Sequence, residues 1–125
     1  MSVLVDTSVW IAYFRGTGNL TAVDALIDEN LLVTNDLLLA ELIPPLRIRR
    51  QSRLIHLMQA IARCPLTINW DEITDMQVLC LRHGINNVGL PDLIIAQNAI
   101  QNGLALFTLD RHFRLMSRHI PLSLH

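Results

Sequence analysis

Four acidic residues occupy positions where a carboxylate can do chemistry. Asp6 follows the apolar run VLV, Asp110 follows LALFTL, and Asp92 stands at the expected start of a helix. Glu41 interrupts the apolar segment LLLAELI, where helix capping gives no reason for an acid. If the four converge, they repel one another unless a divalent cation binds them, and an all-oxygen site suits Mg²⁺ or Mn²⁺. Such a site supports in-line hydrolysis at phosphorus.

Each acid also has a purely structural interpretation. N-capping and the helix macrodipole favour an aspartate at the start of a helix, which would explain Asp6, Asp92 or Asp110 taken singly. Glu41 shares its predicted helical face with leucines, so burial would require a metal or an arginine beside it. Its structural alternative is to point to solvent at the helix edge. The residues alone leave both interpretations open.

Strands and helices are expected to alternate around these acids. Strands are expected at 3–5, 31–33, 65–68 and 104–109, with a fifth at 120–124. Helices are expected at 9–14, 20–27, 37–43, 47–62, 69–83, 91–102 and 113–116, with Pro44 and Pro45 ending the third and a loop at 16–19. Thr34 and Asn35 are candidate caps of the third helix, and Asn69 with Glu72 resembles a capping box at the start of the fifth. This alternation predicts a three-layer α/β domain with a central, mainly parallel sheet of four to five strands. Open parallel sheets bind ligands at the carboxyl ends of their strands, where Asp6 and Asp110 lie.

Length and composition narrow the class of protein. The 125 residues suit one domain, 1–125, and 51% hydrophobic residues exceed what one core of this size hides, so some apolar surface is expected to face a partner. No apolar run is long enough to span a membrane, and a soluble cytoplasmic protein is expected. Ten arginines without lysine exclude a P-loop or a catalytic lysine. Cys64 and Cys80 are expected to be reduced and buried.

Four motifs together resemble the PIN-domain nucleases, and specifically the VapC-type ribonuclease toxins of type II toxin–antitoxin (VapBC) systems. They are VDTSVWI at 5–11, AEL at 40–42, LPDLIIAQNA at 90–99 and TLDRHF at 108–113. The resemblance covers essentially the whole chain, and the order and spacing of the motifs carry it. It implies an endoribonuclease that depends on Mg²⁺ or Mn²⁺ and holds the metal through Asp6, Glu41, Asp92 and Asp110.

The resemblance also implies partners. They are an RNA substrate, a second copy of the chain in a homodimer, and a cognate VapB-type antitoxin that blocks activity in a larger toxin–antitoxin assembly. The leucine-rich segment 37–61 is the candidate antitoxin groove, since an amphipathic peptide lays its apolar side in such a groove. Two alternatives remain: a PIN nuclease of RNA processing, or a catalytically silent PIN-fold binding module.

Polar and basic side chains near the acids are candidates for supporting roles. The hydroxyls of Thr7, Ser8 and Thr108 are expected to orient carboxylates or bind phosphate oxygens, with helix capping as the alternative for the first two. Candidate RNA contacts are Arg47, Arg49, Arg50, Arg53 and Arg111. For the first four arginines the alternative is a solvated helix face, and for Arg111 and His112 an ordinary surface position.

Overall fold

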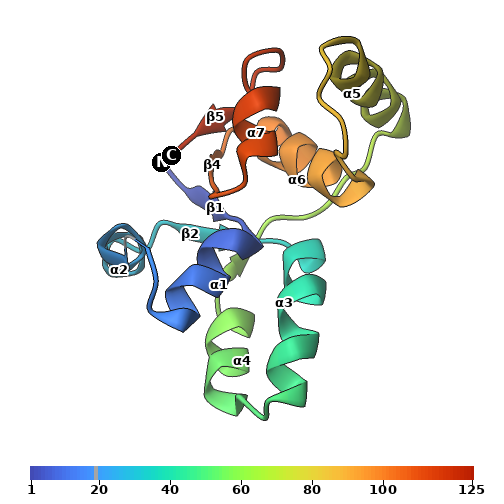
Figure 1. The fold of residues 1–125 in the computed structure, drawn as a ribbon. Helices are drawn as coiled ribbons and strands as arrows, with labels where there is room; N and C mark the ends of the chain where they lie inside the picture. Colours follow the sequence, from blue (N-terminus) through green and yellow to red (C-terminus); the bar gives the residue numbers. More distant parts are fainter. Residues whose placement is uncertain (19) are drawn as a thin grey trace.

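The centre of the computed structural model, which describes residues 1–18 and 20–125, is a parallel β-sheet (Figure 1). The strands in these residues are β1 (Val3–Val5), β2 (Leu32–Thr34), β3 (Ala62–Arg63), β4 (Ala105–Phe107) and β5 (Ser123–Leu124). They lie in the order β3-β2-β1-β4-β5, and Leu4 of β1 pairs with Val33 on one side and Leu106 on the other. Every neighbouring pair is parallel, so all carboxyl ends lie at one edge.

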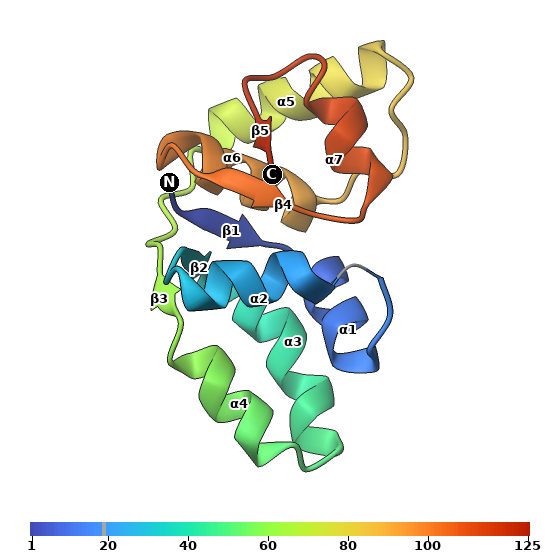
Figure 2. The ribbon, with the colours of Figure 1, turned by 90° about the vertical axis from the view of Figure 1, so that its left-hand side faces the viewer.

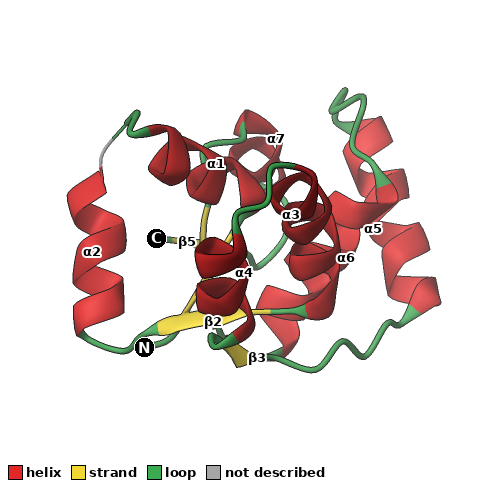
Figure 3. Cartoon of the chain, turned by 90° about the horizontal axis from the view of Figure 1, so that it is seen from below, coloured by secondary structure: helices red, strands yellow, loops and turns green. Residues whose placement is uncertain are grey.

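Helices cover both faces of this sheet. The described residues form α1 (Thr7–Arg15), α2 (Leu20–Asp28), α3 (Asp36–Ile48), α4 (Ser52–Gln59), α5 (Trp70–Arg82), α6 (Leu90–Gln101) and α7 (Arg111–Met116). One core cluster joins Val3 and Val5 to α1, α2, α3 and α4, and a second joins Leu4 and Leu106 mainly to α5, α6 and α7. Seen from below, α2 and α5 lie far apart with the strands between them (Figure 3). The predicted three-layer α/β architecture is confirmed.

Helix α3, which carries Glu41, is longer than the sequence predicts. Pro44 and Pro45 were expected to end it, but α3 continues through both to Ile48. Both prolines lie on the exposed face, so water can bond the two carbonyl groups that lose their helical N–H donors. The opposite face packs into the core and holds the helix together beyond the prolines through Leu42, Ile43 and Leu46.

The prediction of a single helix at 47–62 is also wrong. Its first residues end α3, a turn follows, and α4 begins at Ser52. Arg50 adopts a left-handed backbone conformation with φ of 55° in this turn, and the N–H of Gln51 donates to the carbonyl of Leu46 at 2.9 Å. The turn folds α4 back onto α3 and buries Met58 in their shared cluster. Figures 1 and 2 show this pair projecting away from the sheet.

The third strand lies a few residues earlier than the expected 65–68. Strand β3 pairs with β2 at residues 62–63, and the expected strand is an irregular segment. Its backbone is bonded by amide side chains of α6 instead of by a neighbouring strand. Gln97, Asn98 and Gln101 donate at 2.9–3.0 Å to the carbonyl groups of Asn69, Pro65 and Thr67, respectively. Sequence periodicity cannot predict that side chains of α6 take the place of a neighbouring strand, because these bonds depend on how a distant helix packs.

Other local predictions agree with the structure. Asn35 caps α3 by accepting from the N–H of Leu38 at 2.8 Å, and Asn69 caps α5 by accepting from Glu72 at 3.1 Å. The loop expected at 16–19 is described through Gly18, and residue 19 lies outside the described residues. Both cysteines are buried and free. None of the described helices is long and apolar enough to cross a membrane.

Candidate metal centre

Asp6 lies at the carboxyl end of β1, where it leads into α1. Its side chain is buried, with 4% of the residue exposed, and its N–H donates to the carbonyl of Phe107 on β4 at 2.9 Å. Two hydroxyls donate to the same carboxylate oxygen, Oδ2: Ser8 at 2.7 Å and Thr108 at 2.9 Å. Thr7 is farther away, with its hydroxyl 3.5 Å from Oδ1. Side chains from the start of α1 and from the turn after β4 therefore fix the direction of the Asp6 carboxylate.

The two hydroxyls have no proton left for each other. Ser8 accepts from the N–H of Leu109, and Thr108 accepts from the N–H of Asp110, both at 3.0 Å. Each hydroxyl carries a single proton, and both protons point to Asp6. The 3.4 Å separation of the two hydroxyl oxygens is therefore a contact between acceptors. The capping role considered for Ser8 and Thr7 is wrong, because their hydroxyls face Asp6, the N-cap residue of α1.

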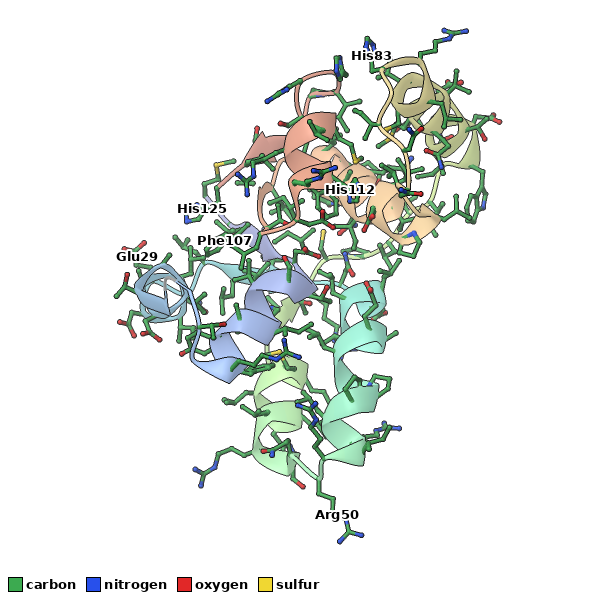
Figure 4. All side chains as sticks on the ribbon, in the orientation of Figure 1. Glu29, Arg50, His83, Phe107, His112 and His125 are labelled. Carbon is green, nitrogen blue, oxygen red and sulfur yellow. The ribbon has the colours of Figure 1, made fainter. Side chains whose placement is uncertain are left out.

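Asp110 combines the capping position with a place in the acidic group. Its Oδ1 accepts from the N–H of His112 at 2.9 Å, which caps α7. The same oxygen lies 3.0 Å from Nδ1 of His112, an ion pair when the imidazole is protonated. Oxygens of Asp92 and Asp110 and a ring nitrogen of His112 all lie within 4.8 Å of one another. Figure 4 shows His112 at the start of α7, beside α6.

The pKa of Asp92 reports on its acidic neighbours. Burial raises this pKa most, and the negative charges of Asp110 and Asp6 raise it further. A hydrogen bond from the backbone of Gly89 and the nearby His112 lower it. Asp92 lies in the first turn of α6, whose N-cap residue is Gly89, so it has the place at the start of a helix that the sequence suggested. For Asp92, as for Asp110, the helix-start role and the clustered-acid geometry coexist.

Glu41 lies on an exposed face of α3, whereas its leucine neighbours Leu38 and Leu42 are buried. Of the two interpretations that the sequence left open, the structure shows the position at the solvent side of the helix, which Glu41 shares with the prolines. Its pKa is nevertheless raised, first by partial burial and then by the charges of Asp6 and Asp92. The repulsion links the helix acid to the acids at the sheet edge. All four acids thus belong to one electrostatic group.

This group has the donor chemistry of a hard-cation site. Neighbouring negative charges raise the pKa of Glu41 and of Asp92, and a divalent ion would neutralise that repulsion with the oxygen ligands that Mg²⁺ and Mn²⁺ prefer. Sequence reasoning treated His112 as a surface residue, but it is half-buried against Asp110. The available signal was its place two residues after Asp110, on the first turn of a helix capped by that acid.

The candidate arginines are spread over the surface. All five are exposed: Arg47, Arg49, Arg50, Arg53 and Arg111. Arg111 is the first residue of α7, next to Asp110. Arg49 lines a groove that also contains Glu41 and Thr7, whereas Arg47, Arg50 and Arg53 lie outside its lining. Arg15, which the sequence did not single out, lines the same groove.

A parallel sheet with acids grouped at its carboxyl edge defines an α/β protein suited to binding a hard cation. The model of the PIN domain family matches residues 3–118, and the chain belongs to this family. No curated protein sequence matches the chain closely enough to count as a relative.

Solved structures share the whole fold at low sequence identity. A chain in the structure of VapBC2 from Rickettsia felis, bound to a DNA fragment from their promoter, has a TM-score of 0.77 and 18% identity, with 100% of this chain and 98% of that chain covered. A chain of VapBC-1 from nontypeable Haemophilus influenzae has a TM-score of 0.74 and 21% identity, with 100% of this chain and 97% of that chain covered. A chain of FitAcB from Neisseria gonorrhoeae has a TM-score of 0.70 and 20% identity, with 98% of this chain and 95% of that chain covered.

Proposed function

We propose that this protein is a Mg²⁺- or Mn²⁺-dependent endoribonuclease and the toxin of a toxin–antitoxin pair, inhibited by a cognate antitoxin. The observation that carries the proposal is the grouping of four carboxylates: Asp92 and Asp110 have oxygens within 4.8 Å of each other, the charges of Asp110 and Asp6 raise the pKa of Asp92, and those of Asp6 and Asp92 raise the pKa of Glu41. Membership of the PIN domain family supports nuclease activity, and the similarity to chains of VapBC structures supports the toxin role.

Residues of this chain would have three roles at such a site: holding the cation, orienting the carboxylates and placing positive charge beside them. Asp6, Glu41, Asp92 and Asp110 would hold the cation, which when bound would activate water and stabilise charge on a phosphodiester. Ser8 and Thr108 fix one oxygen of Asp6 and leave the other free of any strong hydrogen bond within the described residues. His112 places a positive charge, when protonated, beside Asp110. The acids then face the reacting phosphate in one fixed arrangement.

Replacing the acids tests the nuclease assignment. Asp6→Asn and Asp92→Asn should abolish cleavage of RNA in the presence of Mn²⁺ while the circular dichroism spectrum stays unchanged. Asp75→Asn removes an exposed acid on α5 and is the matched control, with activity equal to wild type. Full cleavage by either site variant would overturn the assignment, and an inactive wild type that binds no Mn²⁺ would favour a silent binding module.

Expression in a host tests the toxin assignment. The wild-type chain should arrest growth, and the product of a neighbouring reading frame should restore it. Asp92→Asn should leave growth unaffected. A wild-type chain that cleaves RNA without arresting growth would instead indicate a nuclease of RNA processing.

Apolar surface where α4 packs beside α1 and α2 is the proposed antitoxin contact, and within the expected segment 37–61 it involves α4. A cavity of about 270 Å³ lies between α1, α2 and α4 and is lined by side chains that include Trp10, Phe14, Ile27, Leu57 and Met58. Leu57 is 55% exposed, although it is apolar. An amphipathic peptide would cover this surface. Leu57→Asp should therefore reduce inhibition by the antitoxin and keep RNA cleavage, whereas unchanged inhibition would argue against the contact.

Two copies of the chain are proposed to form a homodimer. Light scattering after size-exclusion chromatography should give twice the chain mass, and a mass equal to one chain at every concentration would contradict this.

A further inference from the structure

A groove of about 530 Å³ runs from Glu41, one of the four grouped acids, along α1 and α3 to the start of α4. Thr7 and Glu41 line its acidic end. Arg15, at the end of α1, and Arg49, directly after α3, line it as well. The remaining lining is mostly apolar, with Ile11, Phe14, Leu42, Pro45, Leu46 and Leu54. The groove therefore joins an acidic end to arginines across an apolar floor.

The two helices place their arginines at matching distances from the acidic end. Arg15 follows Thr7 along α1, and Arg49 follows Glu41 along α3, in each case after roughly two helical turns or about 12 Å. The helices contact each other, so both arginines reach one groove. A chain bound at the acids and lying in the groove would meet both guanidinium groups.

Neither guanidinium has an acidic partner in the part of the chain that the structure describes. The arginine ion pair found there joins Arg63 to Asp36, at 3.2 Å. Arg15 and Arg49 are both exposed, and their like charges face one groove. A phosphate group satisfies such a pair, because guanidinium donors match phosphate oxygens in geometry and charge.

We propose that this groove holds the RNA strand on one side of the cleaved bond, with Arg15 and Arg49 binding its phosphates. This proposal rests on the proposed nuclease function and names how that site holds its substrate. The apolar floor receives bases, which only a single strand exposes, so the bound RNA is single-stranded. The proposal separates Arg49 from Arg47, Arg50 and Arg53, which do not line the groove.

Salt-dependent RNA binding tests the proposal. The probe is a short fluorescein-labelled single-stranded RNA, and every variant carries Asp92→Asn so that the probe is not cleaved. Arg15→Gln and Arg49→Gln should each weaken binding about tenfold at low salt. Each should also reduce the slope of log affinity against log salt by about 0.7, the value for one phosphate contact on a single strand. Arg53→Gln is the matched control and should change the slope by much less.

A neutral methylphosphonate, placed at one linkage at a time, locates the contacts. One position should weaken binding to the parent chain and have no further effect on Arg49→Gln, because the same contact is already lost. The positions for Arg15 and Arg49 should lie on the same side of the cleaved bond. Sensitive positions on both sides, or none that couples to either arginine, would overturn the proposal.

The outcomes separate this proposal from the nuclease assignment. If the wild-type chain cleaves RNA, and the two arginine substitutions change neither binding in the Asp92→Asn background nor cleavage in the wild-type background, the groove assignment is wrong and the nuclease assignment stands. If the wild-type chain cleaves no RNA but both variants lose salt-dependent binding, the groove assignment stands alone. If the variants lose only inhibition by a protein partner, the groove is a protein contact and the proposal is overturned.

Discussion

Asp6 is a buried carboxylate without a cationic partner among the described residues, yet it is not left unsatisfied. Hydroxyls of Ser8 and Thr108 donate to one of its oxygens, and each hydroxyl is held in place by a backbone N–H from the turn after β4. Neutral hydrogen bonds satisfy the carboxylate oxygen without cancelling its charge. The negative charge therefore remains available to a divalent ion.

Thr108→Val removes one of these hydroxyls and keeps the shape of the side chain. It leaves Oδ2 of Asp6 with one fewer donor and the N–H of Asp110 without its acceptor. Because outer hydrogen bonds orient metal ligands, Mn²⁺ affinity should fall roughly 10- to 100-fold in calorimetric titration. Thr108→Ser should restore most of the affinity.

A threonine elsewhere supplies the control for this substitution. Thr74 on α5 bonds the carbonyl of Trp70 at 2.9 Å, far from the acids in sequence, and Thr74→Val should leave Mn²⁺ affinity unchanged. Equal Mn²⁺ affinities for wild type and Thr108→Val would show that Thr108 does not position Asp6 for metal binding.

For single residues, the sequence predicts the positions of the grouped acids better than the positions of the arginines near them. Asp6 and Asp110 are visible because each directly follows an apolar run in the sequence, and the parallel pairing of β1 with β4 then brings the ends of these runs together. Arg15 carries no such signal, because it is an ordinary basic residue in the last turn of α1. Its place in the groove depends on how α1 packs against α3, which the local sequence does not encode.

Helix α6 is held by amide side chains on its buried side. Asn98 is 2% exposed, accepts from Nδ2 of Asn35 at 3.0 Å and donates to the carbonyl of Pro65 at 2.9 Å. Asn35 also caps α3. This pair of asparagines therefore connects the helix that carries Asp92 to the helix that carries Glu41.

Asn98→Leu replaces the amide with an apolar group of similar size. Nδ2 of Asn35 and the carbonyl of Pro65 then lose their partners in a buried place, so the free energy of unfolding should fall by about 2–4 kcal/mol. Urea denaturation measures this change. Asn102→Ala, which removes a bond to the carbonyl of Asn98 at an exposed position, should cost about 1 kcal/mol or less. Equal losses for the two variants would contradict the connecting role of Asn98.

Errors in predicting the elements have the same physical origin. Pro44 and Pro45 carry a strong local signal to end a helix, but burial of the opposite face of α3 outweighs it. The segment 65–68 has the composition of a strand, but side chains of α6 take its carbonyl groups. In both regions contacts from distant residues decide the outcome. Where local and distant signals agree, as at Asn35 and Asn69, the sequence predicts the structure correctly.

On the scale of the whole molecule, a net charge of −1 hides an uneven distribution of charge. Four of the eleven acids form one group at the sheet edge, and the groove beside them contains two arginines. Repulsion within the acidic group opposes folding whenever the acids are ionised. We expect a divalent cation to reverse this effect, so that the stability of the folded chain should depend on pH and on metal together.

The pH dependence of the metal-free chain follows from Glu41 and Asp92. Both have a pKa raised above that of the unfolded chain, so their contribution to stability is fully present below the unfolded carboxyl pKa of about 4. It is lost as pH rises through the raised pKa values. In the presence of a chelator at pH 7.5, Asp92→Asn should therefore unfold at a temperature equal to or above that of wild type. A clear fall would mean that the charge of Asp92 stabilises the metal-free fold.

Metal should reverse the order of the unfolding temperatures, so that wild type unfolds at a higher temperature than Asp92→Asn. Mn²⁺ binds ionised carboxylates, so at pH 7.5 a concentration 100-fold above the dissociation constant should stabilise wild type by about 2.7 kcal/mol and raise its unfolding temperature by several degrees. Protons compete for Glu41 and Asp92 at higher pH than for ordinary carboxyls, so this gain should shrink steadily towards pH 5. Asp92→Asn should gain little from Mn²⁺ at either pH. Differential scanning fluorimetry over this range measures both effects, and a pH-independent gain shared by the variant would place the metal away from these acids.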